Sequence, residues 1–413
     1  SALNSINSEL EEMGEIQGAG KAMILRKITL PLVLPAILSA VILTFSKAIG
    51  TFGTINYLGS PVQYYTLSSQ LYMNINSRDT QTGFAMAILM IIIASIAVFV
   101  NQKLIGSRKS YATIGGKGGR SALIGLGKVG RPVITAALFV FFAVGIIMPI
   151  VILVMESFML KEGIYSLDNF TLHYWIGESN PQIMEGLPGI FKNDEFINSL
   201  FNSLRLTLVN GVFGTIFGQL LGYITAKGRG RLHGKLVEQL VFIPYLIPSV
   251  AFGGIYLSMF SQPQQIFGVT LVPALYGTFA LLTLVSVVKH LPFAARAGTS
   301  NMLQISGELE EAATIEGAGF FRRFVKIVFP LSKGGFISGF MLIFVSIMKE
   351  LDLIILIMTP TTSTLPYLAF RYQNGNSPQA SDCVAIVMFS IVFLVYAIAN
   401  LSGKADLAKS MAG

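Results

Sequence analysis

Residue types that commonly perform covalent chemistry are scarce in this chain of 413 residues. The single cysteine, Cys383, excludes a disulfide framework and a thiolate metal cluster. The three histidines, His173, His233 and His290, lie far apart in the sequence, so we expect no metal site. Because no nucleophile–base constellation is present either, we expect no catalytic residues.

A phosphate-binding loop is also absent from the sequence. Each Gly-Lys pair lacks both the upstream glycine and the following Ser or Thr of G-x-x-x-x-G-K-[ST]. The glycine-rich run 115–130 follows no predicted strand and carries basic residues, which favours a flexible linker. We therefore expect no cofactor on this chain.

The composition is that of an integral membrane protein. Hydrophobic residues make up 53% of the chain, and charged residues make up 12%. Soluble domains carry roughly 25% charged residues. This difference excludes a disordered chain, a nucleic-acid-binding domain and most soluble enzymes, and it makes the lipid bilayer an expected partner.

Eight segments are long and apolar enough to cross a bilayer, which takes about 20 residues. They cover 32–54, 82–101, 133–157, 199–226, 236–260, 269–289, 332–358 and 383–401. The segment 102–131 is basic and has no acidic residue, as has the short loop 227–235, so both are predicted to face the cytoplasm. Alternation then places 1–31, 290–331 and the C-terminus in the cytoplasm and the acidic loop 158–197 outside.

Of the ionisable residues inside predicted spans, where charge is costly and commonly marks a pathway, four are candidates for such a role. They are Lys47 in the first span and Lys349, Glu350 and Asp352 in the seventh. The two acids could pass a cation along a pore. Alternatively, Lys349 neutralises one of them in a structural pair, or they lie near the outer surface.

Three further basic residues mark the ends of predicted spans. Arg205 begins the fourth span, from which it could reach the outer interface. Lys289 and His290 end the sixth span at the cytoplasmic face, where we expect them to be solvated.

An internal repeat relates the two ends of the chain. Residues 6–32 align without a gap to residues 305–331, with 13 identities over 27 positions at an offset of 299. The register persists through the following span, which places Pro61 opposite Pro360. The chain therefore contains parts of two homologous halves.

Each repeated segment combines acidic residues, a Gly-Ala-Gly break and a basic amphipathic stretch that ends in proline. Acidic residues suit a helix start, and glycine suits its end. Two short helices joined at a glycine corner would form a docking surface for a cytoplasmic partner. The alternative is an ordinary amphipathic segment lying on the membrane.

The motif in these segments, E-A-A followed after three residues by G and after nine more by I-x-L-P, resembles the signature loop of permease subunits of type I, binding-protein-dependent ABC importers. The second copy carries Glu311, Ala312, Ala313, Gly317, Ile327 and Pro330. The first copy carries Glu12, Gly18, Ile28 and Pro31. The first copy has Met13 and Gly14 in place of the alanines, and the second has Phe329 in place of leucine.

The resemblance implies that these residues form coupling loops that dock on two copies of a cytoplasmic ATPase subunit. ATP and Mg²⁺ would be bound by that subunit, and this chain would be a non-enzymatic transport subunit in the bacterial inner membrane. An extracytoplasmic binding protein would deliver the substrate. The departure at the alanines raises the question of whether the two loops couple equally.

The resemblance also implies a division of the chain. Residues 1–101 would be the loop and last two spans of a first half, 102–131 a cytoplasmic linker, and 132–413 a complete second half with its coupling loop at about 303–330. We therefore expect sequence preceding Ser1.

Fused halves resemble ferric-iron permeases and their relatives for thiamine, polyamines and aminoethylphosphonate. Ferric iron is the first choice of substrate. A rival from another class is a secondary transporter driven by an ion gradient, since such proteins also use internal repeats. A duplicated cytoplasmic docking loop favours the ATP-driven importer.

Overall fold

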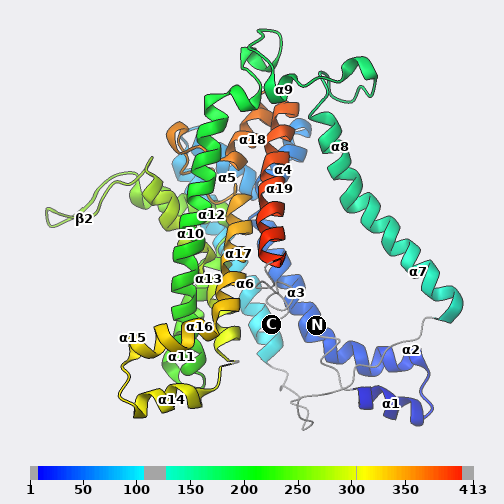
Figure 1. Cartoon of the computed structure of the whole chain (residues 1–413), viewed down its shortest axis with the longest axis vertical. Helices are drawn as coiled ribbons and strands as arrows, with labels where there is room; N and C mark the ends of the chain where they lie inside the picture. Colours follow the sequence, from blue (N-terminus) through cyan, green and yellow to red (C-terminus); the bar gives the residue numbers. More distant parts are fainter. Residues whose placement is uncertain (1–7, 107–126, 304, 402–413) are drawn as a thin grey trace. The chain divides into compact units, whose positions relative to one another are not determined.

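The computed structural model describes residues 8–106, 127–303 and 305–401. Within these ranges the chain is almost entirely helical, with one two-stranded sheet (Figure 1). The α-helices are α1 (Ser8–Ile16), α2 (Lys21–Ile24), α3 (Leu30–Ile49), α4 (Gly53–Gly59), α5 (Leu67–Asn76), α6 (Thr80–Gly106), α7 (Gly127–Phe142), α8 (Met148–Glu156), α9 (His173–Ile176), α10 (Asp194–Lys227), α11 (Leu232–Leu246), α12 (Ser249–Phe260), α13 (Phe279–Met302), α14 (Gly307–Ile315), α15 (Phe320–Arg323), α16 (Phe329–Leu331), α17 (Lys333–Met348), α18 (Leu365–Asn374) and α19 (Pro378–Leu401).

Shorter elements connect these helices. Three π-helical turns are η2 (Leu25–Thr29), η4 (Ala143–Ile147) and η8 (Phe324–Val328), and the 3₁₀ turns are η3 (Ser60–Val62), η5 (Leu167–Asn169), η6 (Met184–Gly186), η7 (Ile190–Lys192) and η9 (Pro360–Thr362). Strands β1 (Gln264–Ile266) and β2 (Val269–Val272) pair antiparallel as a hairpin.

Five helical stretches in the described residues are long and apolar enough to cross a membrane, or up to seven if each of two bent pairs is one span. The five are α6, the continuous stretch α7–η4–α8, α10, α13 and α19. The bent pairs are α11 with α12, at 97°, and Phe320–Leu331 with α17, at 76°. The predicted first span falls on α3, whose apolar part Ala40–Ile49 is shorter. The predicted all-α membrane fold is confirmed.

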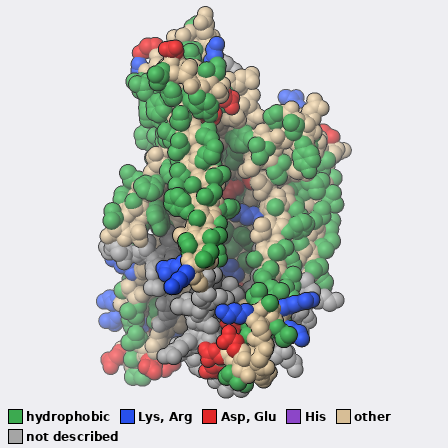
Figure 2. Space-filling view, turned by 90° about the vertical axis from the view of Figure 1, so that its right-hand side faces the viewer, with side chains coloured by type: hydrophobic (Ala, Val, Ile, Leu, Met, Phe, Trp, Pro, Cys, Tyr) green, Lys and Arg blue, Asp and Glu red, His purple; other side chains and the backbone are tan. Residues whose placement is uncertain are grey.

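The described residues divide into two compact units, one comprising Ser1–Ile49 and Ile92–Val151 and the other Gly50–Ile91 and Ile152–Gly413. In the first unit, α7 exposes large hydrophobic side chains along its length, among them Val133, Leu138 and Phe139. Figure 2, in which this helix faces the viewer, shows the same apolar surface. Such a surface is suited to lipid.

In the second unit, α10 packs closely against α13 and α17. Glycine makes this approach possible, because a Cβ on Gly218 would lie 2.3 Å from the Ala294 Cβ. A Cβ on Gly222 would lie 2.5 Å from the Gly298 carbonyl carbon.

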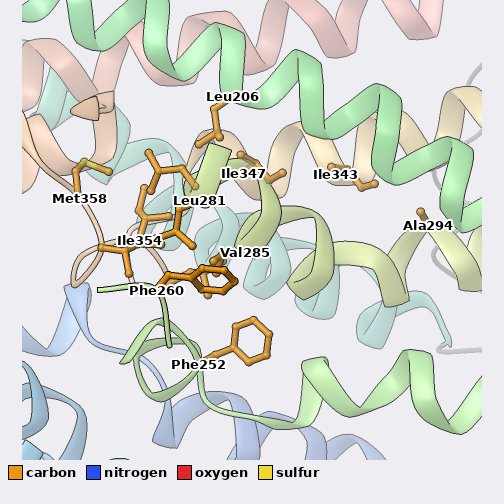
Figure 3. Close-up of a cluster of buried hydrophobic side chains, with 13 residues drawn as sticks. Leu206, Phe252, Phe260, Leu281, Val285, Ala294, Ile343, Ile347, Ile354 and Met358 are labelled. Atoms are coloured by element: carbon orange, nitrogen blue, oxygen red, sulfur yellow. The ribbon is translucent and has the colours of Figure 1, made fainter. Parts of the chain in front are cut away.

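A buried apolar cluster lies in the same unit (Figure 3). It joins Phe252 and Phe260 of α12 to Leu206, Leu281, Val285, Ile343 and Ile347.

A separate apolar cluster lies at the N-terminal end of α10. It joins Tyr174, Ile190 and Phe196 to Leu368 and Tyr372 of α18 and to Val384 of α19. An ion pair between Arg371 and Glu195 crosses the same contact and raises the pKa of the Arg371 guanidinium. The long loop predicted to lie outside the membrane is therefore packed on α18 and α19.

The repeat found in the sequence is also present in the element boundaries. α14, α15 and η8 each begin and end 299 residues after α1, α2 and η2. α17 likewise ends 299 residues after α3, but the second copy is broken at Ser332, where the chain bends by 76°. The two homologous segments thus adopt the same local structure up to the entry into the following helix.

Two predicted spans have different limits in the structure. α17 ends at Met348, so Lys349, Glu350 and Asp352 follow the helix and do not lie within it. The chain continues in buried turns from Leu351 to Met358. This segment is apolar, and hydropathy alone therefore predicts that it continues the helix. α13 begins at Phe279, after the β1–β2 hairpin, and continues to Met302. Residues 107–126 of the predicted linker lie outside the described residues.

Candidate functional site

The second copy of the repeated loop is a helical hairpin of α14 and α15. Ser306 caps α14, since its side-chain oxygen accepts a hydrogen bond from the Glu308 backbone N–H at 3.3 Å. Gly317 ends the helix with a φ of +78°, and the Ala318 N–H donates to the Ala313 carbonyl at 2.9 Å. This is the glycine cap that the sequence predicts, and it turns the chain into α15.

The first copy has the same cap. Gly18 has a φ of +82°, and the Ala19 N–H donates to the Gly14 carbonyl at 3.0 Å. The Gly18 N–H donates to the Glu15 carbonyl at 2.9 Å, as the Gly317 N–H does to Thr314 at 3.0 Å. The hydrogen bonds of the two corners are therefore equivalent.

Most of the residues predicted to couple are exposed. They are Glu12, Gly18 and Pro31 in the first copy and Glu311, Ala312, Gly317 and Pro330 in the second. Ile28, Ala313 and Ile327 are partly buried. Each hairpin thus presents an accessible face of the kind a docking surface requires.

Sequence reasoning missed one pair of residues on these faces. Ile16 and Ile315 are the last residues of α1 and α14 and are 85% and 86% exposed. A signal for them was present, because they are apolar, identical in both copies and located next to the glycine corner. An exposed isoleucine in the same place on both hairpins adds an apolar contact to each face.

The two hairpins are held in place by different bonds. Glu310 is buried, accepts a hydrogen bond from the Tyr223 hydroxyl at 2.6 Å and pairs with the Lys227 ammonium at 2.6 Å. Both partners belong to α10, so this carboxylate ties the second hairpin to a long membrane-spanning helix. The equivalent Glu11 instead accepts a hydrogen bond from Thr29 within its own hairpin, at 2.6 Å.

The glycine that replaces the second alanine in the first copy has a steric explanation. Gly14 occupies the place of Ala313, and a Cβ there would lie 3.0 Å from Ile28 Cδ1 and 3.3 Å from Ile24 Cγ1. In the second copy Ile24 is replaced by Arg323, whose guanidinium donates to the Thr314 hydroxyl. The first hairpin therefore has an apolar interior that a glycine accommodates, whereas the second has room for an alanine.

A second feature is a contact between equivalent residues of the two repeats. The Gly53 N–H donates to Asp352 Oδ1 at 2.9 Å, and these residues are 299 positions apart. Tyr72 of α5 and Phe370 of α18 also lie edge to face, with ring centroids 6.1 Å apart. Segments that follow the repeated hairpins therefore contact each other within the second unit.

Aromatic side chains fill the space beside this contact. Phe52 is fully buried between Tyr72, at 4.6 Å between ring centroids, and Phe370, at 5.5 Å. Tyr57 lies 5.7 Å from the ring of Phe370. Asp352, which the sequence singled out, is therefore next to an aromatic cluster.

A buried charged cluster is the largest departure from the sequence predictions. Lys289 and His290, predicted to be solvated at the end of a span, are 7% and 4% exposed in the middle of α13. His290 Nε2 lies 3.5 Å from Glu350 Oε2, and Glu350 Oε1 accepts a hydrogen bond from the Leu353 N–H at 2.9 Å. The prediction of solvation was wrong because α13 extends well beyond position 289.

Lys289 holds the break between α11 and α12. A broken helix leaves carbonyls without helical partners, and the Lys289 ammonium donates to two of them, Pro244 at 2.9 Å and Ile247. It also lies 5.3 Å from the centre of the Phe252 ring. Within the described residues this charge thus joins α13 to the break and to α12.

The remaining pathway candidates are exposed. Lys349 is at the surface, and the side chain beside the Glu350 carboxylate is that of His290 instead of Lys349. Lys47 lies in the last turn of α3 and is exposed. Among the described residues no group of three His, Cys, Asp or Glu side chains could hold a metal ion.

Comparison with known proteins gives a consistent match. Residues 1–111 and 218–405 match the family model for the binding-protein-dependent transport system inner membrane component. The chain is 22% identical to the ferric transport system permease protein FbpB of Actinobacillus pleuropneumoniae, over 100% of this chain and 57% of that protein. The chain therefore spans a little over half the length of this relative.

Two further matches cover less of the chain. The sulfate transport system permease protein CysT of Synechocystis is 26% identical over 49% of this chain and 71% of its own length. The crystal structure of a bacterial ABC transporter for import of the polysaccharide alginate aligns with a TM-score of 0.51 and 16% identity, over 65% of this chain and 94% of that chain. The family match covers most of the chain, and this protein belongs to the binding-protein-dependent transport system inner membrane components.

Proposed function

We propose that this chain is the membrane-spanning permease of a type I ABC importer and that its two hairpins couple it to ATPase subunits. The observation that carries the proposal is the recurrence of one helical hairpin, with the same glycine cap and the same exposed face, 299 residues apart. Two equivalent faces call for two copies of one partner. ATP and Mg²⁺ are bound by that partner, and this chain performs no covalent chemistry.

We assign the docking residues to the exposed faces of the two hairpins. They are Glu12, Gly18, Ile28 and Pro31 in the first hairpin, and Glu311, Ala312, Ala313, Gly317, Ile327 and Pro330 in the second. Both hairpins and the C-terminus lie in the cytoplasm of a bacterium, and the loop 158–197 faces an extracytoplasmic binding protein. Residues 1–101 belong to a first half, 102–131 to a linker and 132–413 to a second half.

Ferric iron is the proposed substrate. The ferric relative matches the whole chain, whereas the sulfate relative matches about half of it. Asp352 accepts a hydrogen bond from its counterpart in the first repeat, Gly53, and Glu350 lies two residues before it. Carboxylates favour the passage of cations, while an oxyanion would favour basic residues and N–H donors. Lys47 and Lys349 remain candidate pathway residues.

Coupling can be tested with two matched charge reversals. Glu311→Lys alters the motif, whereas Glu238→Lys alters an exposed acid of α11, outside both hairpins. In detergent extracts of cells that also produce the ATPase, Glu311→Lys is expected to lower copurification of the ATPase at least tenfold, and Glu238→Lys is expected to leave it unchanged. Equal copurification with both variants would refute the docking assignment.

The substrate can be tested in proteoliposomes that contain the permease, its ATPase and its binding protein. We expect ATP-dependent uptake of ferric iron and none of sulfate. Asp352→Asn removes the charge but keeps an oxygen that can accept from the Gly53 N–H, and it should slow uptake at least tenfold without loss of the ATPase. Sulfate uptake that is insensitive to Asp352→Asn would exclude iron while leaving the importer assignment intact.

A further inference from the structure

An apolar groove runs between α10 and α13 on the surface of the second unit. Its volume is about 410 Å³, which lies in the range of small-molecule sites. Arg205, Val209, Phe213 and Phe217 line one side, and Phe279 and Thr283 belong to the other. The side chains of Phe213 and Phe217 are half exposed to the groove.

One charged residue stands at the end of this otherwise apolar groove. The Arg205 guanidinium lies 4.2 Å from the centre of the Phe279 ring. Stacking on the ring face leaves the N–H donors at the edge of the guanidinium available. Within the described part of the chain no carboxylate forms an ion pair with Arg205, and the Thr283 hydroxyl is satisfied by the Phe279 carbonyl at 3.0 Å.

The position of Arg205 along α10 matches a membrane surface. Lys227, at the other end of the helix, pairs with Glu310 of the hairpin, 22 residues away from Arg205. At about 1.5 Å per residue this separation is roughly 33 Å, close to the roughly 30 Å hydrocarbon thickness of a bilayer. Arg205 is therefore at the level of lipid headgroups when the hairpin lies at the opposite surface.

The length of the groove matches one leaflet. Arg205, Val209, Phe213 and Phe217 follow one another at intervals of four residues and so lie on one face of the helix. They extend over roughly 18 Å, whereas half of the hydrocarbon core is roughly 15 Å thick. A lipid chain that begins at Arg205 would reach Phe217 near the middle of the membrane.

We propose that the α10–α13 groove binds one anionic phospholipid, with its phosphate on Arg205 and an acyl chain along Phe213 and Phe217. Arginine binds phosphate through two parallel N–H donors, which fixes the headgroup as well as attracting it. The assignment requires only that the chain spans the membrane, and it does not depend on the transported substrate or on the ATPase.

The first test measures lipid retention by native mass spectrometry of the purified, delipidated chain. The probes are phosphatidylglycerol and a diacylglycerol with the same acyl chains but no phosphate. Wild type should bind phosphatidylglycerol at least tenfold more tightly than diacylglycerol, and Arg205→Gln should lose one bound phosphatidylglycerol. Arg296→Gln is the matched control, because Arg296 also lies over a phenylalanine ring, that of Phe242, at 5.8 Å outside the groove.

Equal retention by wild type and Arg205→Gln, or equal loss in Arg205→Gln and Arg296→Gln, would overturn the proposal. A second test places a benzophenone amino acid at Phe213 in cell membranes. Illumination should give a phospholipid adduct that Arg205→Gln reduces at least fivefold, while an adduct at the exposed Phe393 of α19 stays unchanged. A protein adduct at Phe213 would show that another polypeptide segment occupies the groove and would also overturn the proposal.

Discussion

The two hairpins of this chain have the same backbone and different supports. In both, a glycine with positive φ ends the first helix, and an isoleucine is exposed beside it. The second hairpin is tied through Glu310 to Tyr223 and Lys227 of α10, while the first is closed on itself through Glu11 and Thr29. The shape of the hairpin is thus independent of the interaction that holds it in place.

Removal of the two equivalent carboxylates gives the largest expected difference between the hairpins. Glu310→Ala leaves the Tyr223 hydroxyl and the Lys227 ammonium without their acceptor, at a cost of about 2–3 kcal/mol. Glu11→Ala removes one partly exposed bond, at a cost of about 1 kcal/mol. Hydrogen–deuterium exchange of the two hairpins in the full chain measures both effects. Equal increases in exchange would contradict the difference in support.

Alanine at the two glycine corners should have equal effects. Gly18→Ala and Gly317→Ala each place a Cβ on a residue with positive φ, which costs about 1–2 kcal/mol. Exchange of the last turns of α1 and α14 should rise to the same extent. Gly20→Ala and Gly319→Ala are the controls, because both glycines have φ near −70° and open space around them. A corner that tolerates alanine would show that its cap is not needed.

A smaller effect distinguishes the interiors of the hairpins. Gly14→Ala should be close to neutral, because the gain in helix preference is offset by crowding against Ile24 and Ile28. In an Ile28→Ala background, which removes the nearest contact, the same change should stabilise α1 by up to about 0.5–1 kcal/mol relative to the background. The difference is measured as a double-mutant cycle from exchange rates. A coupling of zero would mean that packing against Ile28 does not account for the glycine.

The smallest expected effect concerns Thr29, which donates a hydrogen bond to Glu11, and the equivalent Val328. Thr29→Val removes the hydrogen bond to Glu11 and should destabilise the first hairpin by about 1 kcal/mol or less. Val328→Thr, the reverse change in the second hairpin, should have no effect as long as Glu310 keeps its bonds to α10. Slower hydrogen–deuterium exchange of the second hairpin in Val328→Thr would contradict this expectation. It would indicate that Glu310 can accept a hydrogen bond from the introduced threonine in place of its bonds to α10.

The sequence was sufficient to predict the hairpins because their determinants are local. The acidic start, the Gly-Ala-Gly corner and the proline all act within a few residues, and the repeat doubled the signal. The bonds of Glu310 could not be predicted in this way, since Tyr223 and Lys227 lie about 85 residues earlier in the chain and their approach depends on how α10 packs.

Hydropathy failed where protein, and not lipid, surrounds an apolar segment. Leu353, Ile354 and Ile357 are at most 1% exposed, and they form buried turns after α17 instead of prolonging it. A hydropathy window measures apolar character alone, so it extended the predicted span to 358. For the same reason the hydropathy window ended the sixth span at Lys289. A buried lysine can stay inside a helix when the carbonyls of a broken helix accept its hydrogen bonds, as those of Pro244 and Ile247 do here.

The hydrogen bond between Gly53 and Asp352 depends on a difference in sequence between the two repeats. In a symmetric dimer, each copy of a residue at the axis faces itself, so an aspartate there would bring two negative charges together. Here the positions opposite Lys349, Glu350 and Asp352 are Gly50, Thr51 and Gly53. Because the two positions carry different residues, one carboxylate faces a backbone donor, an arrangement that two identical subunits could not form.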